Sequence, residues 1–171
     1  MALGSNTKFY ETPNHPFQGE RIADEANLLG RYGLKNKEEL WRAQSELRGY
    51  RREARKLLGS AGEHETESAE FLARLKRYGI LNEQDQLDDV LSLDVTDVLE
   101  RRLQTVVYRK GYANTPEQAR QFIVHGHIVL DDARVTRPGM TVETTVEDSV
   151  GFDEHSSLSD ELHPERAEAQ E

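Results

Sequence analysis

Apolar residues recur at helical spacing over residues 36–59, where the chain reads NKEELWRAQSELRGYRREARKLLG. Steps of three and four residues place these apolar residues on one helical face: Leu40, Ala43, Leu47, Tyr50, Ala54 and Leu57. Asn36 is a candidate N-cap with Glu39 three residues later, and Gly59 is a candidate stop. The pattern predicts a long amphipathic helix, preceded by an N-terminal extension over residues 1–35 that holds a short helix.

The apolar pattern becomes sparser over residues 59–97. A glycine- and acid-rich stretch, GSAGEHETESAE, predicts a loop, and a second helix is expected from about Ser68 to near Gly79. The stretch ILNEQDQLDDVLSLDV is acidic with a skeleton of leucine and valine, which indicates a connector that packs. Residues 36–97 are therefore predicted to form one helical region.

The segment DVLERRLQTVVYRKG predicts a further helix that ends at Gly111. Its apolar face carries Leu99, Leu103, Val106 and Val107. The opposite face is expected to carry Arg101, Thr105 and Tyr108, flanked by Arg102 and Arg109.

The next predicted helix has strong start and stop signals. Thr115 is a candidate N-cap, Pro116 occupies the first helical position, and Gln118 closes a capping box. The helix is expected to leave Arg120 and Gln121 outside and to stop at Gly126. Beyond it, HIVLDDARVT alternates like two strands about a turn at residues 131–132, with a register that the weak Asp-Asp turn signal leaves open.

These elements together predict an α+β fold. A mainly helical N-terminal region precedes a small domain over residues 98–149, in which two helices pack on a short antiparallel sheet. From residue 150 the pattern loses apolar periodicity, and residues 150–171 are expected to form a disordered acidic tail.

Composition narrows the class of protein. The chain is 36% hydrophobic and 32% charged, which favours a helical, very polar protein. It has no cysteine, so disulfides and cysteine-based zinc sites are excluded. No apolar run approaches the roughly 18 residues of a membrane span, and the start MALGSNTKFY lacks a signal-peptide core. We expect a soluble cytoplasmic protein without a membrane partner.

The formal net charge of -10 is unevenly distributed along the chain. Residues 37–57 hold seven basic and four acidic groups, and residues 98–140 hold the same numbers. Residues 63–97 hold ten acidic groups against three basic, and residues 141–171 hold ten against one. Two net-basic segments thus stand apart from two acidic blocks.

The basic segments carry candidate anion-binding side chains. Four arginines lie within eight residues beside Tyr50, and each guanidinium can bind phosphate with a fork of donors: Arg48, Arg51, Arg52 and Arg55. A plain solvated helix face is the alternative. Tyr50 and Trp41 are at helical spacing and are more typical of core than of base-stacking platforms.

Metal binding has little support in the sequence. The acidic connector lacks the EF-hand spacing, and no histidine or cysteine joins it. His125 and His127 are two residues apart, which invites a metal hypothesis, but no further ligands lie nearby in the sequence. Hydrogen bonding to RNA or plain exposure is favoured, and no metal or cofactor is expected.

The stretch RRLQTVVYRKGYANTPEQARQFIVHGHIVLDDARVTRPG resembles a small RNA-binding domain of two helices and a compact sheet. That domain is shared by the fourth small-subunit ribosomal protein, several RNA pseudouridine synthases and bacterial-type tyrosyl-tRNA synthetases. The preceding chain, including KFYETPNHPFQGERI and LDDVLSLDVTDVLERRLQT, resembles the archaeal and eukaryotic form of that ribosomal protein family. The resemblance covers residues 5–142. The acidic tail departs from it, because many relatives end basic.

The resemblance implies a structural role in the small ribosomal subunit. Family members bind the subunit's rRNA directly, nucleate assembly of its body, help line the region where messenger RNA enters, and influence decoding accuracy with neighbouring ribosomal proteins. A folded RNA junction is recognised through its shape, phosphates and ribose hydroxyls. The expected rRNA-binding residues are Arg48, Arg51, Arg52, Arg55, Arg101, Arg102, Arg109, Lys110, Arg120, Gln121, His125, His127, Arg134 and Arg137.

Two other functions remain open at this point. A non-ribosomal RNA-binding protein could share the small domain, but the chain carries no phosphate-cradling glycine loop, nucleophile elbow or paired metal motif. We therefore expect no enzyme and no small-molecule substrate. A helical protein-interaction module would use the arginines for solubility alone.

The acidic excess suggests a source for the chain. It has six lysines against sixteen arginines, and acidic residues dominate its loops and its end. At about 1 M salt the screening length falls to about 3 Å, so distant acidic blocks scarcely repel RNA. We hypothesise that the chain comes from a salt-loving archaeon. The free protein is then expected to lose structure at low salt.

Overall fold

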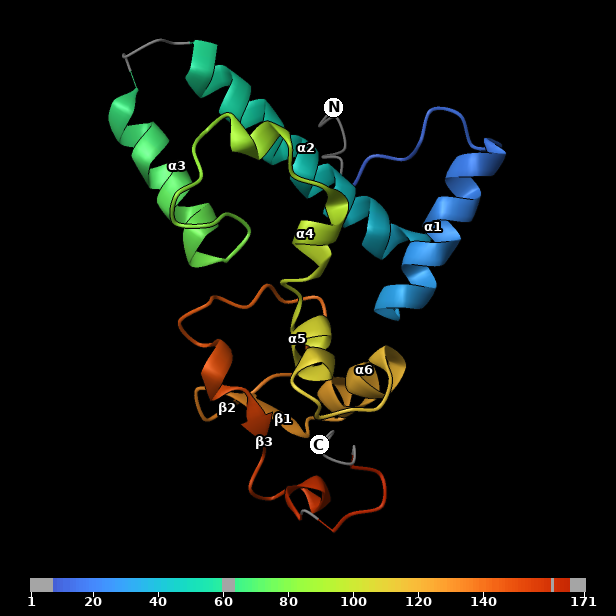
Figure 1. The fold of residues 1–171 in the computed structure, drawn as a ribbon. Coiled ribbons are helices and arrows are strands. Elements are labelled where there is room, and N and C mark those ends of the chain that lie inside the picture. The colour runs from blue at the N-terminus through green and yellow to red at the C-terminus, as the bar shows by residue number, and fades with distance from the viewer. Residues whose placement is uncertain (1–7, 60–63, 161, 167–171) are drawn as a thin grey trace, which may run out of the picture.

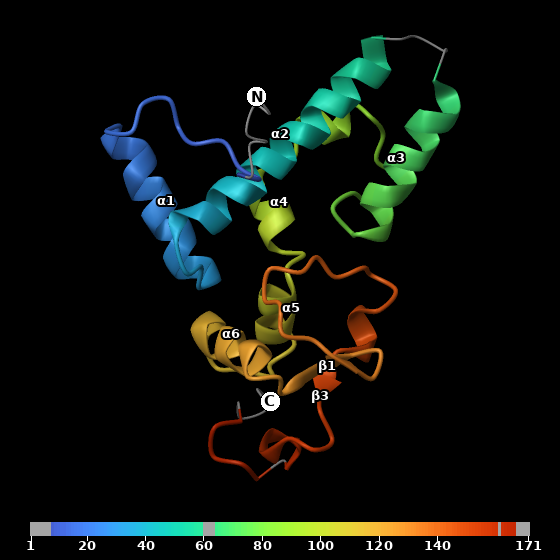
Figure 2. The same ribbon diagram turned by 180° about the vertical axis from the view of Figure 1, so that it is seen from behind.

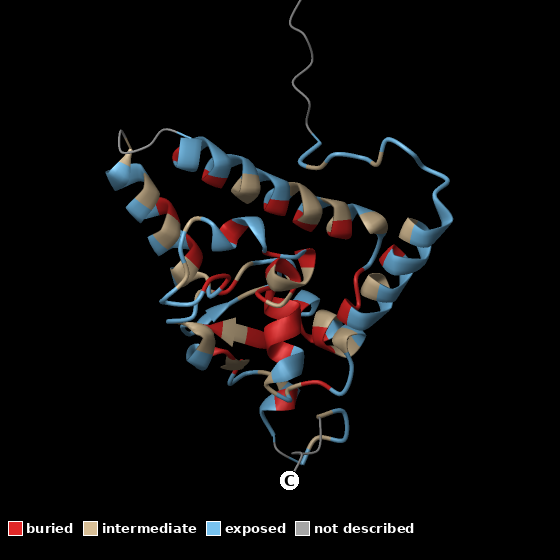
Figure 3. Ribbon diagram, turned by 45° about the horizontal axis from the view of Figure 1, so that its top comes forward, coloured by how far each residue is buried: buried red, intermediate tan, exposed pale blue. Residues whose placement is uncertain are grey.

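The computed structural model describes residues 8–59, 64–160 and 162–166. Helix α2 (Lys37–Gly59) is the long helix along one side of the molecule (Figure 1). Its buried residues, Leu40, Ala43, Leu47, Ala54 and Leu57, face the rest of the molecule (Figure 3). The Oδ1 of Asn36 accepts the backbone N–H of Glu39 at 3.2 Å, so the predicted N-cap is confirmed. The predicted stop at Gly59 is confirmed as well.

The N-terminal region is helical, as the sequence predicts. Helix α1 (Gly19–Tyr32) packs near the start of α2, and α3 (Glu65–Arg77) packs near its end (Figure 1). Helix α3 begins three residues before the predicted Ser68. The 3-10 turn η1 (Asp89–Leu91) and helix α4 (Val95–Leu99) pack on α2 and confirm that the acidic connector is a packing segment. These elements share one apolar core.

The single helix predicted over residues 97–110 is wrong. Helix α4 ends at Leu99, and α5 (Leu103–Arg109) begins after Arg102, whose backbone is extended with φ −74° and ψ 142°. The carbonyls of Met140 and Pro138 accept the first two N–H groups of α5, at 2.7 and 3.1 Å. A segment distant in sequence thus satisfies donors that a helix start leaves free.

The small domain is built on helices α5 and α6 (Pro116–Val124). Strand β1 (Ile128–Leu130) lies between β2 (Ala133–Arg134) and β3 (Gly151–Phe152), and both pairings are antiparallel (Figure 1). Figure 2 shows β1 and β3 beside α5 and α6. Asp131 and Asp132 form the predicted turn, with φ values of 49° and 60° that suit a type I′ hairpin. The turn fixes the register that the sequence left open, with Leu130 opposite Ala133. The α+β class is confirmed.

Packing of the small domain continues past residue 149, where the sequence predicted that the acidic tail begins. Strand β3 pairs with β1, and Val150 and Leu158 are each 3% exposed. The 3-10 turns η2 (Glu147–Ser149) and η3 (Ser157–Ser159) flank the strand. Isolated apolar residues in an acidic sequence carry no periodic signal, yet they join a core that the earlier chain builds. Residues 161 and 167–171 of the expected tail lie outside the described residues.

Candidate nucleic-acid interface

The four α2 arginines lie in different surroundings. Arg48 and Arg52 pair with Glu11 at 2.7 and 3.9 Å, so the N-terminal segment lies against this part of the helix. Arg51 donates to the backbone carbonyl of Leu93 and is half-buried. Arg55 is exposed, and no ion pair joins it to another residue of the described chain. The four therefore do not form one uniform cationic row.

Arg101 and Arg102 are buried, at 7% and 8% exposed, where the sequence predicted a solvent-facing side and its flank. The break between α4 and α5 turns both side chains inward. Arg101 pairs with Glu147 at 2.8 Å and donates to the carbonyl of Val142 at 3.0 Å. The prediction that Arg101 and Thr105 lie on an exposed face is wrong, because Thr105 is also buried and donates to the carbonyl of Leu99 at 2.8 Å.

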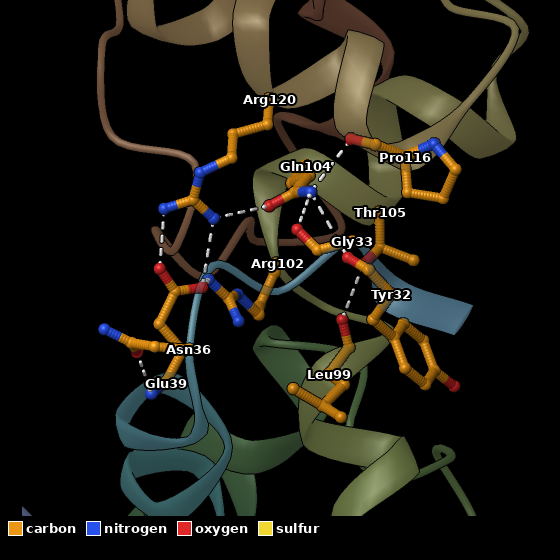
Figure 4. A network of polar contacts seen from close by, with 10 residues as sticks. All are labelled: Tyr32, Gly33, Asn36, Glu39, Leu99, Arg102, Gln104, Thr105, Pro116 and Arg120. Carbon is orange, nitrogen blue, oxygen red and sulfur yellow. Dashed lines mark hydrogen bonds and ion pairs between the residues drawn. The ribbon is translucent and has the colours of Figure 1, made fainter. Parts of the chain in front are cut away.

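Glu39 joins the two parts of the molecule. Its two carboxylate oxygens receive Arg120 from α6 at 2.6 and 3.1 Å, and one of them also receives Arg102 at 2.7 Å (Figure 4). Glu39 therefore does not close the capping box with Asn36 but turns toward the small domain. We call Glu39, Arg102 and Arg120 the Glu39 clamp. The side chain of Arg120 is 22% exposed, so the prediction that it lies on the solvent-facing side of its helix is only partly met.

Gln104 reinforces the clamp from inside. It is 1% exposed, and its amide nitrogen donates to the carbonyls of Gly33 and Pro116, each at 2.8 Å (Figure 4). Its side-chain oxygen accepts Arg120 at 3.3 Å. The end of α1, the start of α6 and the Glu39 clamp are thus tied into one polar network.

The ion pairs shift the pKa values of their carboxyl groups. Burial alone would raise the pKa of Glu39, but hydrogen bonds from Arg120 and Arg102 outweigh it and hold the pKa below its ordinary value. Glu147 follows the same rule, with burial opposed by Arg101 and Arg109. Both carboxylates are therefore charged partners of the arginines at neutral pH.

Several predicted small-domain residues lie on the surface in ion pairs. Arg109 reaches Glu147 at 2.8 Å and Lys110 reaches Asp148 at 3.3 Å. The Nε of Arg134 donates to Asp153 at 2.8 Å. The carboxylates of Glu147, Asp148 and Asp153 thus lie against basic side chains of the small domain.

The remaining predicted residues are less engaged. Gln121, His125 and Arg137 are exposed, and none has an ion pair or side-chain hydrogen bond within the described ranges. His127 is half-buried, with its Nδ1 2.8 Å from the Oγ of Ser156. The rings of the two histidines lie 6.2 Å apart. In the part of the chain that the structure describes, no group of three or more His, Asp or Glu residues could hold a metal ion.

A groove of about 670 Å³ separates α2 from the loop over residues 136–141. The Glu39 clamp and Arg137 both line the groove. Arg42 also lines the groove, exposed, with its guanidinium 5.9 Å from the ring of Tyr10. Sequence reasoning missed Arg42, which lies outside the dense arginine run. Its membership of the same helix as Arg48 was the only available signal.

No helix within the described residues is long and apolar enough to cross a membrane. Exposed cations of α2 and of the small domain lie on the surface of one fold. Fork-shaped guanidinium groups in such an arrangement suit phosphate oxygens.

Comparisons of the sequence with known proteins find extensive similarity. The S4 domain family model matches residues 101–149. A protein named small ribosomal subunit protein uS4 from Haloarcula marismortui is 98% identical over 171 residues, covering 100% of both chains. The protein of the same name from Halobacterium salinarum is 70% identical over 172 residues, again covering both chains fully. That of Methanococcus aeolicus is 48% identical over 165 residues, covering 95% of this chain and 93% of its own.

Proposed function

Because this chain belongs to the uS4 family of small ribosomal subunit proteins, we propose that it is a structural constituent of the small ribosomal subunit and binds the subunit's rRNA. The observation that carries the proposal is the 98% identity, over the full length of both chains, to a protein of that name. Its proposed location is the cytoplasmic ribosome. The family consists of ribosomal proteins rather than enzymes, and we assign the chain no catalytic activity.

The pattern of ion pairs supports a division of labour among the predicted rRNA-binding residues. Exposed ion pairs contribute about 0–1 kcal/mol, so a phosphate can replace the carboxylate at low cost. Arg48 and Arg52 are of this kind, and Arg109, Lys110 and Arg134 form pairs in which only one of the two side chains is well exposed. They join the exposed residues Arg55, Gln121, His125 and Arg137 as the proposed contacts to RNA.

The buried arginines have a different proposed role. Removing a partner from a buried ion pair costs several kcal/mol, so Arg101 and Arg102 are held by their carboxylates. We assign Arg102 and Arg120, which both bind Glu39 of α2, to holding the two cationic parts at a fixed spacing. Arg51 and Arg101 are assigned to contacts within one part each, with Leu93 and with Glu147. His127, held at Ser156, is assigned to the domain's packing and to any contact its exposed edge makes.

The finer proposal is that the chain binds rRNA early and nucleates the subunit body. A rigid protein with cations on two parts can bridge RNA helices that repel one another. We further propose contacts with neighbouring ribosomal proteins and with messenger RNA where it enters the subunit, and through these an effect on decoding accuracy. These roles follow from the family resemblance of the chain.

The proposal is tested by titrating the full-length chain against in vitro transcribed small-subunit rRNA at several KCl concentrations. We expect salt-sensitive binding, and replacement of Arg55 or Arg137 by Ala lowers the slope of log K against log salt by about 0.7–0.9 for each lost phosphate contact. The matched control is Arg74→Ala, because Arg74 is an exposed α3 arginine paired with Glu53 and outside the proposed surface. If the unaltered chain shows no salt-sensitive binding, the proposal is contradicted.

A further inference from the structure

A second hollow, of about 360 Å³, lies between the end of α1 and helix α5. Tyr32, Thr105 and Pro116 form its inner walls, and Figure 4 shows these three side chains from neighbouring elements. Tyr108 lines the opening. We call this hollow the Tyr108 slot. Its volume lies at the small end of the range for ligand sites, roughly 300–1,000 Å³.

Tyr108 is placed unusually for its helix. Residues 103–107 of α5 are all buried, whereas Tyr108 is 42% exposed. An aromatic ring that stands at the mouth of a largely apolar slot offers a flat face to a second flat group. Aromatic side chains hold unpaired bases in this way, since every base has a π-face.

Cations stand at the edges of the slot. Arg31 is exposed, its guanidinium lies 5.3 Å from the ring centroid of Tyr32, and within the described chain it has no carboxylate partner. Arg109 is 44% exposed at its side chain and pairs with two carboxylates, Glu147 at 2.8 Å and Glu100 at 3.5 Å. The slot therefore combines an apolar interior with positive charge at its rim.

Glu100 supplies a polar contact inside the slot. One of its oxygens accepts the hydroxyl of Tyr32 at 2.7 Å, and the other lies 3.5 Å from Arg109. Each carboxylate oxygen has two acceptor positions, so capacity remains for an N–H donor at the edge of a base. A purely apolar ligand would not use this remaining acceptor capacity.

We propose that the Tyr108 slot binds one unpaired nucleobase of the rRNA. The base stacks on Tyr108, its edge donates to Glu100, and the adjacent phosphates contact Arg31 and Arg109. This inference rests on the proposed rRNA-binding function and adds a site that reads a single-stranded nucleotide. Neither Tyr108 nor Arg31 belongs to the set that the sequence predicted as binding residues.

The test measures binding of the full-length chain to in vitro transcribed Haloarcula marismortui small-subunit rRNA in concentrated KCl. We expect Tyr108→Ala to weaken binding by at least about fivefold, the lower end of the effect of losing one stacked base. Tyr108→Phe keeps the ring and is expected to stay within about twofold of the unaltered chain. The matched control is Phe17→Ala, because Phe17 is 93% exposed and lies far from the slot in sequence.

The outcomes separate the slot from the wider function. If the unaltered chain fails to bind, the rRNA-binding proposal itself fails. If it binds and Tyr108→Ala binds equally well, the slot proposal is overturned and the wider function stands. Circular dichroism checks that each variant is folded.

A second measurement needs no substitution. Ultraviolet irradiation of the protein–rRNA complex, followed by mass spectrometry, is expected to find a nucleotide attached to the peptide that contains Tyr108. A crosslink from that peptide to a neighbouring protein in intact subunits, with none to rRNA, would overturn the proposal. This result would remain decisive even if Tyr108→Ala failed to fold.

Discussion

At the scale of single residues, burial and partner decide what an arginine does. Arg102 and Arg137 belong to the same small domain, yet one is 8% exposed and bound to Glu39 while the other is exposed at the groove. A guanidinium inside a half-buried ion pair serves the fold, because releasing it would leave a charge without a partner. An exposed guanidinium keeps its donors for phosphate.

Glu39 receives two arginines at the junction, so we predict that Glu39→Gln destabilises the chain. Arg102 and Arg120 would then face each other without a compensating charge, at a cost of roughly 1.5–3 kcal/mol. Thermal or denaturant unfolding in concentrated KCl measures the change. Glu53→Gln is the matched control on the same helix, because Glu53 forms an exposed pair with Arg74 and its loss is expected to cost no more than about 1 kcal/mol.

The lowered pKa of Glu39 also predicts an acid dependence of stability. A carboxyl whose folded pKa lies below its unfolded value, near 4.5, stabilises the fold above that value and loses the contribution as pH falls toward the folded pKa. Glu147 adds to the same effect. We therefore expect the difference in unfolding free energy between the unaltered chain and Glu39→Gln to have its full value at pH 7 and to shrink below about pH 4.5. A difference that stays constant down to pH 3 would contradict this assignment.

At the scale of elements, the turn after α1 carries the contact between the helical region and the small domain. Gly33 has φ 57°, and an added Cβ would lie 2.8 Å from the Nε2 of Gln104 and 2.8 Å from the Cβ of Pro116. Contacts shorter than 3.0 Å require the neighbours to move, and these neighbours belong to the polar network around the Glu39 clamp. The position therefore requires glycine for both its backbone angle and its space.

We predict that Gly33→Ala destabilises the chain by about 1–3 kcal/mol, from the left-handed backbone and the close contacts together. Gly30→Ala, three residues earlier, is the matched control: it lies inside α1 with nothing within 4 Å of an added Cβ. That change is expected to stabilise the helix by about 0.5–1 kcal/mol. Unfolding curves of both variants give opposite signs if the argument holds, and two shifts of the same sign would refute it.

Local signals predicted most element boundaries well. Thr115 caps α6 through its Oγ1, which accepts the N–H of Gln118 at 3.1 Å, and Pro116 occupies the first helical position. The Asp131–Asp132 turn formed where it was expected. The error at residues 100–102 came from the backbone of residues 138–142, which competes for the start of α5. These contacts join segments about 40 residues apart, and the hydrophobic pattern of neither segment indicates them.

At the scale of the whole molecule, two apolar cores meet at a polar junction. The first core ends at Leu99 and the second begins at Leu103. Between them lie the buried Arg101 and Arg102 rather than a continuous apolar layer. The relative placement of the two parts therefore depends on charged hydrogen bonds, which require good geometry to offset the cost of burial.

The net charge of -10 predicts that the free chain needs salt to remain folded. Without screening, the acidic groups of residues 63–97 and 141–171 repel one another, and salt at about 1 M screens this repulsion at distances beyond about 3 Å. Relatives from the halophilic archaea Haloarcula marismortui and Halobacterium salinarum fit this expectation. Circular dichroism across a KCl series provides the test, and an equally folded chain without added salt would count against it.

The sequence alone determined most of the helices, the hairpin, the two basic segments and the family, because each depends on residues that are close along the chain. The candidate surface was predicted only as a set of residue types. Tertiary structure decided which arginines point inward, since the break at residues 100–102, the reach of Glu39 across to α6 and the return of the acidic segment onto β1 are long-range contacts. It also decided that Tyr108 opens onto a slot, because α1 and α5 meet only in the folded chain.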